Sequence, residues 1–142
     1  MGGMDVLYTA EALSTGSGRS GHVRTTDGAV DLELAPPKEV GGSGQGANPE
    51  QLFASGYAAC FHSALLGAAR AAKVTVEDSS VGARVNLGKT GDGFGLSVEL
   101  EVVLPGIDPD TAQKLADTAH AHCPYSNATR GNIDVTVTVA ED

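Results

Sequence analysis

The chain has 142 residues, enough for one domain of ordinary size, so we expect a single domain over residues 1–142. Hydrophobic residues make up 41% and charged residues 19%, which excludes a disordered chain; aromatic residues are only 4%, so the core must be aliphatic. The net charge of −9 disfavours binding to nucleic acid and to anionic lipid, because an acidic surface repels phosphate.

The N-terminus indicates no targeting segment. Met1 to Gly3 precede a second methionine, Met4, and we expect residues 1–3 to be an added segment. The start lacks the basic and apolar regions of a signal peptide, and Val6 stands where a myristoylation motif needs Ser or Thr. No apolar run approaches the roughly 18 residues of a membrane-spanning helix, so we expect a cytoplasmic protein.

The first third of the chain predicts short strands joined by glycine-rich turns. Apolar residues alternate from Val6 to Ala12, and Leu32 and Leu34 alternate with acidic residues, as in half-buried strands. The segments 15–21 and 41–46 are rich in glycine and serine and predict loops.

A long helix is predicted next. Asn48 is a good N-cap, Pro49 suits the first helical position, and Glu50 suits the first turn. The chain is almost entirely apolar from Leu52 to about Ala72, which predicts a helix buried on most faces. It should form a central spine covered by sheet, with a partner chain as a further candidate cover.

The remaining elements complete an α+β pattern. Alternating residues predict strands at 81–87 and 94–104, joined by a turn over 88–93, and a last strand at 133–139. Between them, Asp108-Pro109 begins a second helix that ends near His122, because Cys123 precedes a proline. We therefore expect an α+β fold with mainly antiparallel pairing, its sheet packed around the long helix.

The two cysteines, Cys60 and Cys123, are the residues most suited to chemistry. Cys60 lies in mid-helix within an apolar run, where a buried, unreactive cysteine is the commoner case. Cys123 ends the second helix in a polar segment and is accessible to a second sulfur. Two alternatives stay open: a zinc site that uses His120, His122 and Cys123, and a Cys–His hydrolase built on Cys60, although neither has its usual sequence signature.

Three segments resemble the organic hydroperoxide resistance family, within the superfamily of the osmotically inducible protein C. They are residues 48–53 (NPEQLF), 56–61 (GYAACF) and 123–132 (CPYSNATRGN), and the similarity extends over the chain from Met4 onward. The resemblance implies a thiol peroxidase that forms intertwined homodimers. It identifies Cys60 as the peroxidatic cysteine, Cys123 as the resolving cysteine, Arg19 as the residue that stabilises the thiolate, and Glu50 as the acid that holds Arg19.

The implied cycle needs no metal or other cofactor. Cys60 would reduce an organic hydroperoxide, condense as a sulfenic acid with Cys123, and be reset by an external dithiol, for which the family suggests a lipoyl-bearing protein. Aromatic and aliphatic residues near Cys60 on the helix are candidates for an apolar substrate pocket: Phe53, Tyr57, Phe61 and Leu65.

Spacing along the helix bears on the site. Glu50 is ten residues before Cys60, about 15 Å along a straight helix, so we expect Glu50 and Arg19 to act on the Cys60 of a partner chain. Two further functions remain alternatives: a hydroperoxide sensor that uses the same disulfide without turnover, and a zinc-binding structural domain.

Overall fold

The computed structural model describes residues 3–140 of the chain. These residues form two compact units, one up to Pro49 and one from Glu50 onward, each described by itself below. The single domain expected from the sequence stays a prediction. The added segment expected at residues 1–3 falls mostly outside the described residues.

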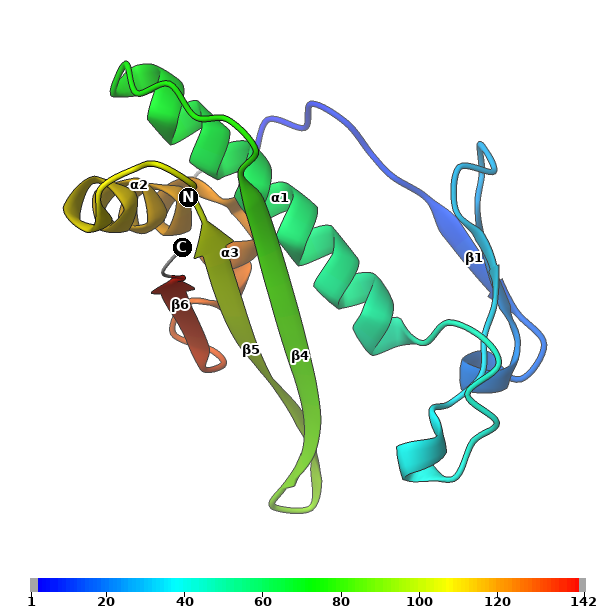
Figure 1. The fold of residues 1–142 in the computed structure, drawn as a ribbon. Coiled ribbons are helices and arrows are strands. Elements are labelled where there is room, and N and C mark those ends of the chain that lie inside the picture. Colours follow the sequence, from blue (N-terminus) through cyan, green and yellow to red (C-terminus); the bar gives the residue numbers. More distant parts are fainter. Residues whose placement is uncertain (1–2, 141–142) are drawn as a thin grey trace. The chain divides into compact units, whose positions relative to one another are not determined.

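Unit 1, up to Pro49, contains a small antiparallel sheet (Figure 1). Its order is β1-β2-β3, and short 3-10 turns follow β1 and β3. The bounds are β1 Ala12–Thr15, η1 Gly18–Ser20, β2 His22–Thr25, β3 Asp31–Glu33 and η2 Lys38–Val40. Both glycine-rich segments are turns or loops, as predicted.

The predicted strand over residues 6–12 does not form. The first strand begins at Ala12, and Val6, Leu7 and Tyr8 are exposed. The alternation of apolar and polar residues indicates only which side chains would be buried if a strand formed. A strand also needs a neighbour for its N–H and C=O groups, and no strand of the described residues pairs with this segment.

A histidine joins two strands of this sheet. The ring of His22 on β2 reaches two carboxylates of β3, with Nδ1 at 2.6 Å from Glu33 Oε1 and Nε2 at 2.5 Å from Asp31 Oδ1. The hydrogen bonds to Glu33 and then to Asp31 raise the pKa of His22 above its usual value. The ring therefore links β2 to β3, and protonation of the ring strengthens this link.

The long helix predicted from the sequence is α1, Pro49–Ala71, which begins at the expected proline. It is buried on one face rather than on most. The buried positions recur every three or four residues: Tyr57, Phe61, Leu65, Ala68 and Ala69. Unit 2 supplies elements to cover only this face, so the helix's other apolar side chains stay at least partly accessible within the unit.

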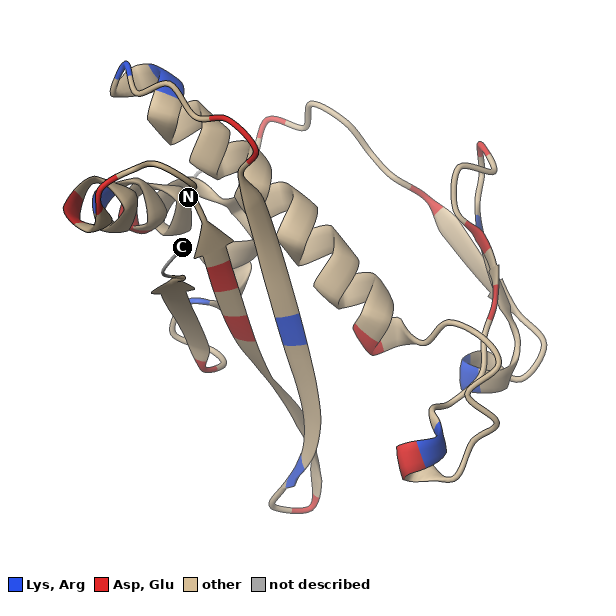
Figure 2. Cartoon of the chain, in the orientation of Figure 1, with Lys and Arg blue, Asp and Glu red and all other residues tan. Residues whose placement is uncertain are grey.

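The length and composition of α1 also suit a membrane span, which the sequence reasoning did not anticipate. The helix has a mean hydropathy of 1.3 over 18 residues. Figure 2 shows no Lys, Arg, Asp or Glu between Glu50 and Arg70. The core helix of a soluble protein passes the same test, and α1 packs Tyr57, Phe61 and Leu65 into a protein core.

The sheet of unit 2 has the order β4-β5-β6. The strands β4 Ser80–Thr90 and β5 Gly93–Val103 form a long antiparallel hairpin, whose turn is shorter than the predicted 88–93 because Thr90 pairs with Gly93. Gly91 has a φ of +56°, which suits the first position of a two-residue hairpin loop. The last strand, β6 Val135–Val139, runs parallel to β5. The other strand pairs of the described residues are antiparallel, which confirms the mainly antiparallel expectation.

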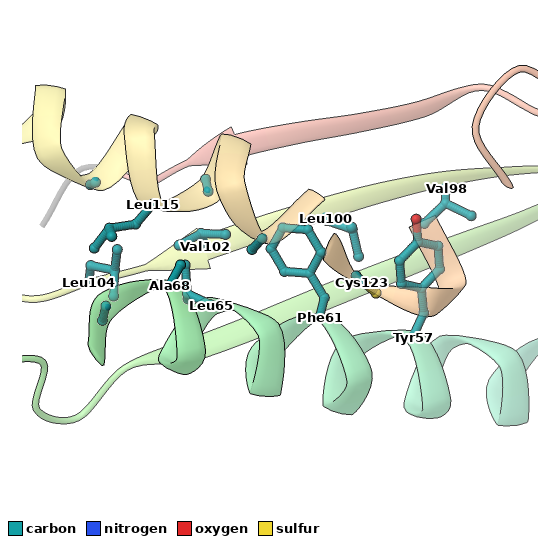
Figure 3. Packing of buried hydrophobic residues seen from close by; sticks show 14 residues of the cluster. Tyr57, Phe61, Leu65, Ala68, Val98, Leu100, Val102, Leu104, Leu115 and Cys123 are labelled. Atoms are coloured by element: carbon teal, nitrogen blue, oxygen red, sulfur yellow. The ribbon is translucent and has the colours of Figure 1, made fainter. Parts of the chain in front are cut away.

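Two consecutive helices complete unit 2. The predicted second helix is α2, Pro109–His122, and its N-cap Asp108 accepts a hydrogen bond from the Thr111 N–H at 3.0 Å. A short helix, α3 Pro124–Thr129, follows at once and was not predicted. Figure 3 shows the core that forms where α1 meets β5 and the second helix. It includes Tyr57, Phe61, Leu65, Val98, Leu100, Val102, Leu115 and Cys123.

Candidate functional site: a pair of cysteines

The structure brings Cys60 and Cys123 together within unit 2. Cys60 lies near the middle of α1, and Cys123 is both the C-cap of α2 and the N-cap of α3. Their sulfur atoms are 3.6 Å apart and not bonded to each other. A disulfide needs sulfur atoms at about 2.05 Å, so a small movement would join them.

The two thiols differ in accessibility. Cys123 is fully buried, whereas Cys60 is partly buried and lines a cavity of about 620 Å³. The cavity runs along α1 beside the second helix and is mostly apolar. Its lining is Cys60, Ser63, Ala64, Gly67, Ala68, Ala71, Thr118, His122 and Pro124. A molecule entering this cavity would meet Cys60 first and Cys123 only after it.

Opposing effects act on the pKa of Cys60. Burial raises it above the usual value, and the neighbouring Cys123 thiol raises it further, while a hydrogen bond from the backbone N–H of Tyr125 lowers it. Burial is the largest of these effects, so the thiol of Cys60 holds its proton more firmly than an ordinary cysteine does. A reactive thiolate at this position therefore needs a further stabilising charge.

Tyr125 reaches the site because its neighbour on α1 is small. The rings of Phe53, Tyr57 and Tyr125 pack together, with the Phe53 and Tyr125 centroids 6.0 Å apart and nearly parallel. A Cβ atom at Gly56 would lie 2.8 Å from the Tyr125 hydroxyl and 3.3 Å from its ring. Gly56 thus leaves space for the aromatic ring of the residue whose N–H contacts Cys60.

A buried hydrogen-bond network lies one turn from the sulfurs, and the sequence reasoning missed it. The Tyr57 hydroxyl is 2.8 Å from Ser126 Oγ and 3.0 Å from Thr129 Oγ1, and Ser126 Oγ is 2.8 Å from His120 Nδ1. Burial lowers the pKa of His120, which favours its neutral ring. The sequence does contain a signal for this network. Ser126 and Thr129 are three positions apart just after Cys123, a spacing that allows both hydroxyls to face the same neighbouring helix.

The other two predicted catalytic residues lie earlier in the chain than the two cysteines. Arg19 is in the 3-10 turn η1 of unit 1, and Glu50 is in the first turn of α1. Because α1 continues without a break from Glu50 to Cys60, these two residues are about 15 Å apart along its axis. The roles predicted for Arg19 and Glu50 stay predictions.

The four predicted pocket residues do not line the cavity beside Cys60. Tyr57, Phe61 and Leu65 are fully buried in the core, and Phe53 packs against that core. This cavity gives their predicted pocket role no support.

The alternative chemistries find little support in unit 2. Among residues 3–140, no three His, Cys, Asp or Glu side chains gather closely enough to hold a metal ion. His120 is hydrogen-bonded to Ser126, and the Cys60 sulfur is hydrogen-bonded to the Cys123 thiol and to the backbone N–H of Tyr125. The arrangement suits sulfur–sulfur chemistry better than it suits a zinc site or a Cys–His pair.

The fold and site together define an α+β protein with two closely paired, unequal thiols. A family model described as OsmC-like protein matches residues 42–138. An organic hydroperoxide resistance protein of Xanthomonas axonopodis pv. citri is 51% identical over 137 residues, which covers 95% of this chain and 96% of that protein.

Solved structures agree with the sequence relatives. An organic hydroperoxide resistance protein of Legionella pneumophila is 48% identical, with a TM-score of 0.92 over 96% of this chain and 100% of that chain. The protein OhrB of Bacillus subtilis is 42% identical, with a TM-score of 0.86 over 95% and 100%. The chain belongs to the OsmC-like family and, within it, to the group of organic hydroperoxide resistance proteins.

Proposed function

We propose that this protein gives resistance to organic hydroperoxides by acting as a cysteine-based peroxidase. The observation that carries the proposal is the 3.6 Å separation of the Cys60 and Cys123 sulfurs, with Cys60 at a cavity and Cys123 buried behind it. The names of the relatives supply the substrate class, organic hydroperoxides.

The cycle has three balanced steps. The Cys60 thiolate attacks one peroxide oxygen, the O–O bond breaks, and an alkoxide leaves and takes a proton as the alcohol. Cys60 is now a sulfenic acid. The Cys123 sulfur then attacks the Cys60 sulfur, a disulfide forms, and water leaves. An external dithiol reduces this disulfide by exchange and is itself oxidised; a lipoyl-bearing protein is the dithiol we propose.

The first step requires a charge that favours the thiolate. Burial raises the pKa of Cys60, and one N–H from Tyr125 opposes that effect only in part. We assign the missing charge to Arg19, oriented by Glu50. Because Glu50 lies about 15 Å from Cys60 along α1, we propose that both act across a homodimer on the partner's Cys60.

The cavity fits an organic substrate better than a small polar one. Its volume of about 620 Å³ lies within the usual range of small-molecule sites, and alanines, a glycine and a proline make up much of its lining. An alkyl group would gain from burial there, whereas hydrogen peroxide has none to bury. We propose no metal or other resident cofactor and a cytoplasmic location.

Counting thiols tests the proposal. Under denaturing conditions, one equivalent of tert-butyl hydroperoxide should remove both thiols, and dihydrolipoamide should restore them. Cys60→Ser should not react, and Cys123→Ser should stop at a sulfenic acid that excess peroxide overoxidises. Survival of both thiols in the unsubstituted protein would overturn the peroxidase. Loss of both thiols without sustained peroxide consumption in the presence of the dithiol would instead favour the sensor.

A further inference from the structure

The Tyr57 hydroxyl joins α1 to α3 beside the two sulfurs. Tyr57 is three residues before Cys60 on α1, and Ser126 is three residues after Cys123 at the start of α3. Two contacts therefore connect α1 to the segment that begins at Cys123. The Cys60 and Cys123 sulfurs are 3.6 Å apart, and the Tyr57 and Ser126 hydroxyl oxygens are 2.8 Å apart. Residues three apart on a helix are neighbours, so the contacts lie side by side.

The hydroxyl bridge is protected from water. Tyr57 and Ser126 are fully buried, and Thr129, which also faces the Tyr57 hydroxyl at 3.0 Å, is 5% exposed. A hydrogen bond in such surroundings has no water to replace it. The helix that it holds has only six residues, too few to be stable alone, so its position depends on contacts of this kind.

We propose that Tyr57 is a positioning residue for the step that forms the disulfide. This inference rests on the proposed peroxidase function. By fixing α3 against α1, the Tyr57 hydroxyl keeps the Cys123 sulfur within reach of Cys60. In this step the Cys123 sulfur attacks the sulfenic sulfur of Cys60, the S–O bond breaks, and the hydroxyl group leaves as water with the Cys123 thiol proton.

The chain allows a clean test, because Tyr57→Phe keeps the ring and leaves the remaining hydroxyls with partners. Ser126 Oγ still has His120 Nδ1 at 2.8 Å, and the Thr129 hydroxyl still donates to the Ser126 carbonyl at 3.2 Å. The control is Ser55→Ala, which removes a hydroxyl from the exposed side of α1, where it donates to the Gln51 carbonyl one turn earlier at 2.8 Å. Both variants should fold.

Rapid mixing with tert-butyl hydroperoxide, followed by acid quench and mass spectrometry, separates the two oxidation steps. Tyr57→Phe should slow disulfide formation about tenfold, because misplacing reacting groups by a fraction of an ångström carries a cost of this order. The formation of sulfenic acid should change less than threefold, and a larger share of Cys60 should reach the sulfinic acid as peroxide increases. Ser55→Ala should match the unsubstituted protein.

A second substitution separates positioning from general destabilisation. Ser126→Ala should also slow disulfide formation, and the double variant should be no slower than the slower single variant, because both remove one bridge. Disulfide formation at the normal rate in Tyr57→Phe would overturn the inference, as would equal slowing of both oxidation steps. If the unsubstituted protein forms no disulfide with peroxide, the proposed function itself has failed.

Discussion

Oxidation of the cysteine pair should make the protein markedly more stable. Cys60 and Cys123 are 63 residues apart in sequence, so a disulfide between them closes a long loop in the unfolded chain. The loss of unfolded-state entropy for a loop of this length corresponds to about 4 kcal/mol at 25 °C. Since the sulfurs already lie 3.6 Å apart, little native-state strain should offset this gain.

Thermal unfolding measures the effect directly. A chain of this length shifts its midpoint by about 2–4 °C per kcal/mol, so the oxidised protein should unfold about 8–16 °C above the reduced protein. The two samples would be prepared with tert-butyl hydroperoxide and with a dithiol, at equal protein concentration, since association also changes the midpoint. Cys60→Ser and Cys123→Ser are the controls and should show no redox-dependent shift.

A redox shift that persists in either serine variant would show that another event causes it. An unchanged unfolding midpoint in the fully oxidised protein would refute the reasoning. It would mean that strain in the oxidised native state cancels the stabilisation that comes from the lower entropy of the unfolded chain.

Three further predictions concern other residues. Gly56→Ala should destabilise the folded state by about 1–2 kcal/mol in urea unfolding, because overpacking against Tyr125 outweighs the helix propensity of alanine; a more stable variant would contradict the contact. Because the pKa of His22 is higher in the folded protein than in the unfolded chain, protonated His22 should stabilise the sheet of unit 1. This stabilisation should be complete at a pH below the pKa of the unfolded chain and should be lost as the pH rises through the pKa of the folded protein. The measurement is the protection of the backbone amides of this sheet in hydrogen exchange, which should fall as the pH rises. The variant His22→Gln should lack this pH-dependent change in protection. Arg19→Ala should raise the pKa of Cys60, seen as an alkylation profile displaced to higher pH; an unchanged profile would exclude Arg19 as the stabilising charge.

Local signals in the sequence accounted for most of the helices and strands. The Asn48-Pro49 and Asp108-Pro109 pairs located the starts of α1 and α2, because capping and proline preferences depend on neighbouring residues alone. The buried residues of α2 are Ala112, Leu115, Ala116 and Ala119, and their spacing of three or four residues is the one that places side chains on a single helix face.

Features of the fold that depend on residues far apart in the sequence, or on very short segments, were predicted less well. The direction in which β6 pairs with β5 is set by the path of the chain, not by the residues of β6. The segment from Val6 to Ala12 alternates like a strand yet lacks a strand partner in the described chain. The six residues of α3 are too few to show a helical period.

The site divides in the same way. From the residues alone, Cys60 was better explained as a core cysteine, and only the family resemblance paired it with Cys123; the structure then placed their sulfurs side by side. Tyr57 was assigned to a pocket because of its ring. Its hydroxyl proved more informative, and its partners are about 70 residues away in sequence, where no spacing rule applies.

The shared cap at Cys123 limits how the cysteine pair can move. The Cys123 N–H donates to the Ala119 carbonyl at 2.8 Å, and the Cys123 carbonyl accepts from Asn127 at 2.9 Å, so its backbone is anchored in two helices at once. Cys60 is likewise held in the middle of α1. Closing the gap between the sulfurs must therefore come mainly from rotation about the two Cα–Cβ bonds. The backbone then serves as a fixed frame, and each turnover would need no local unfolding of either helix.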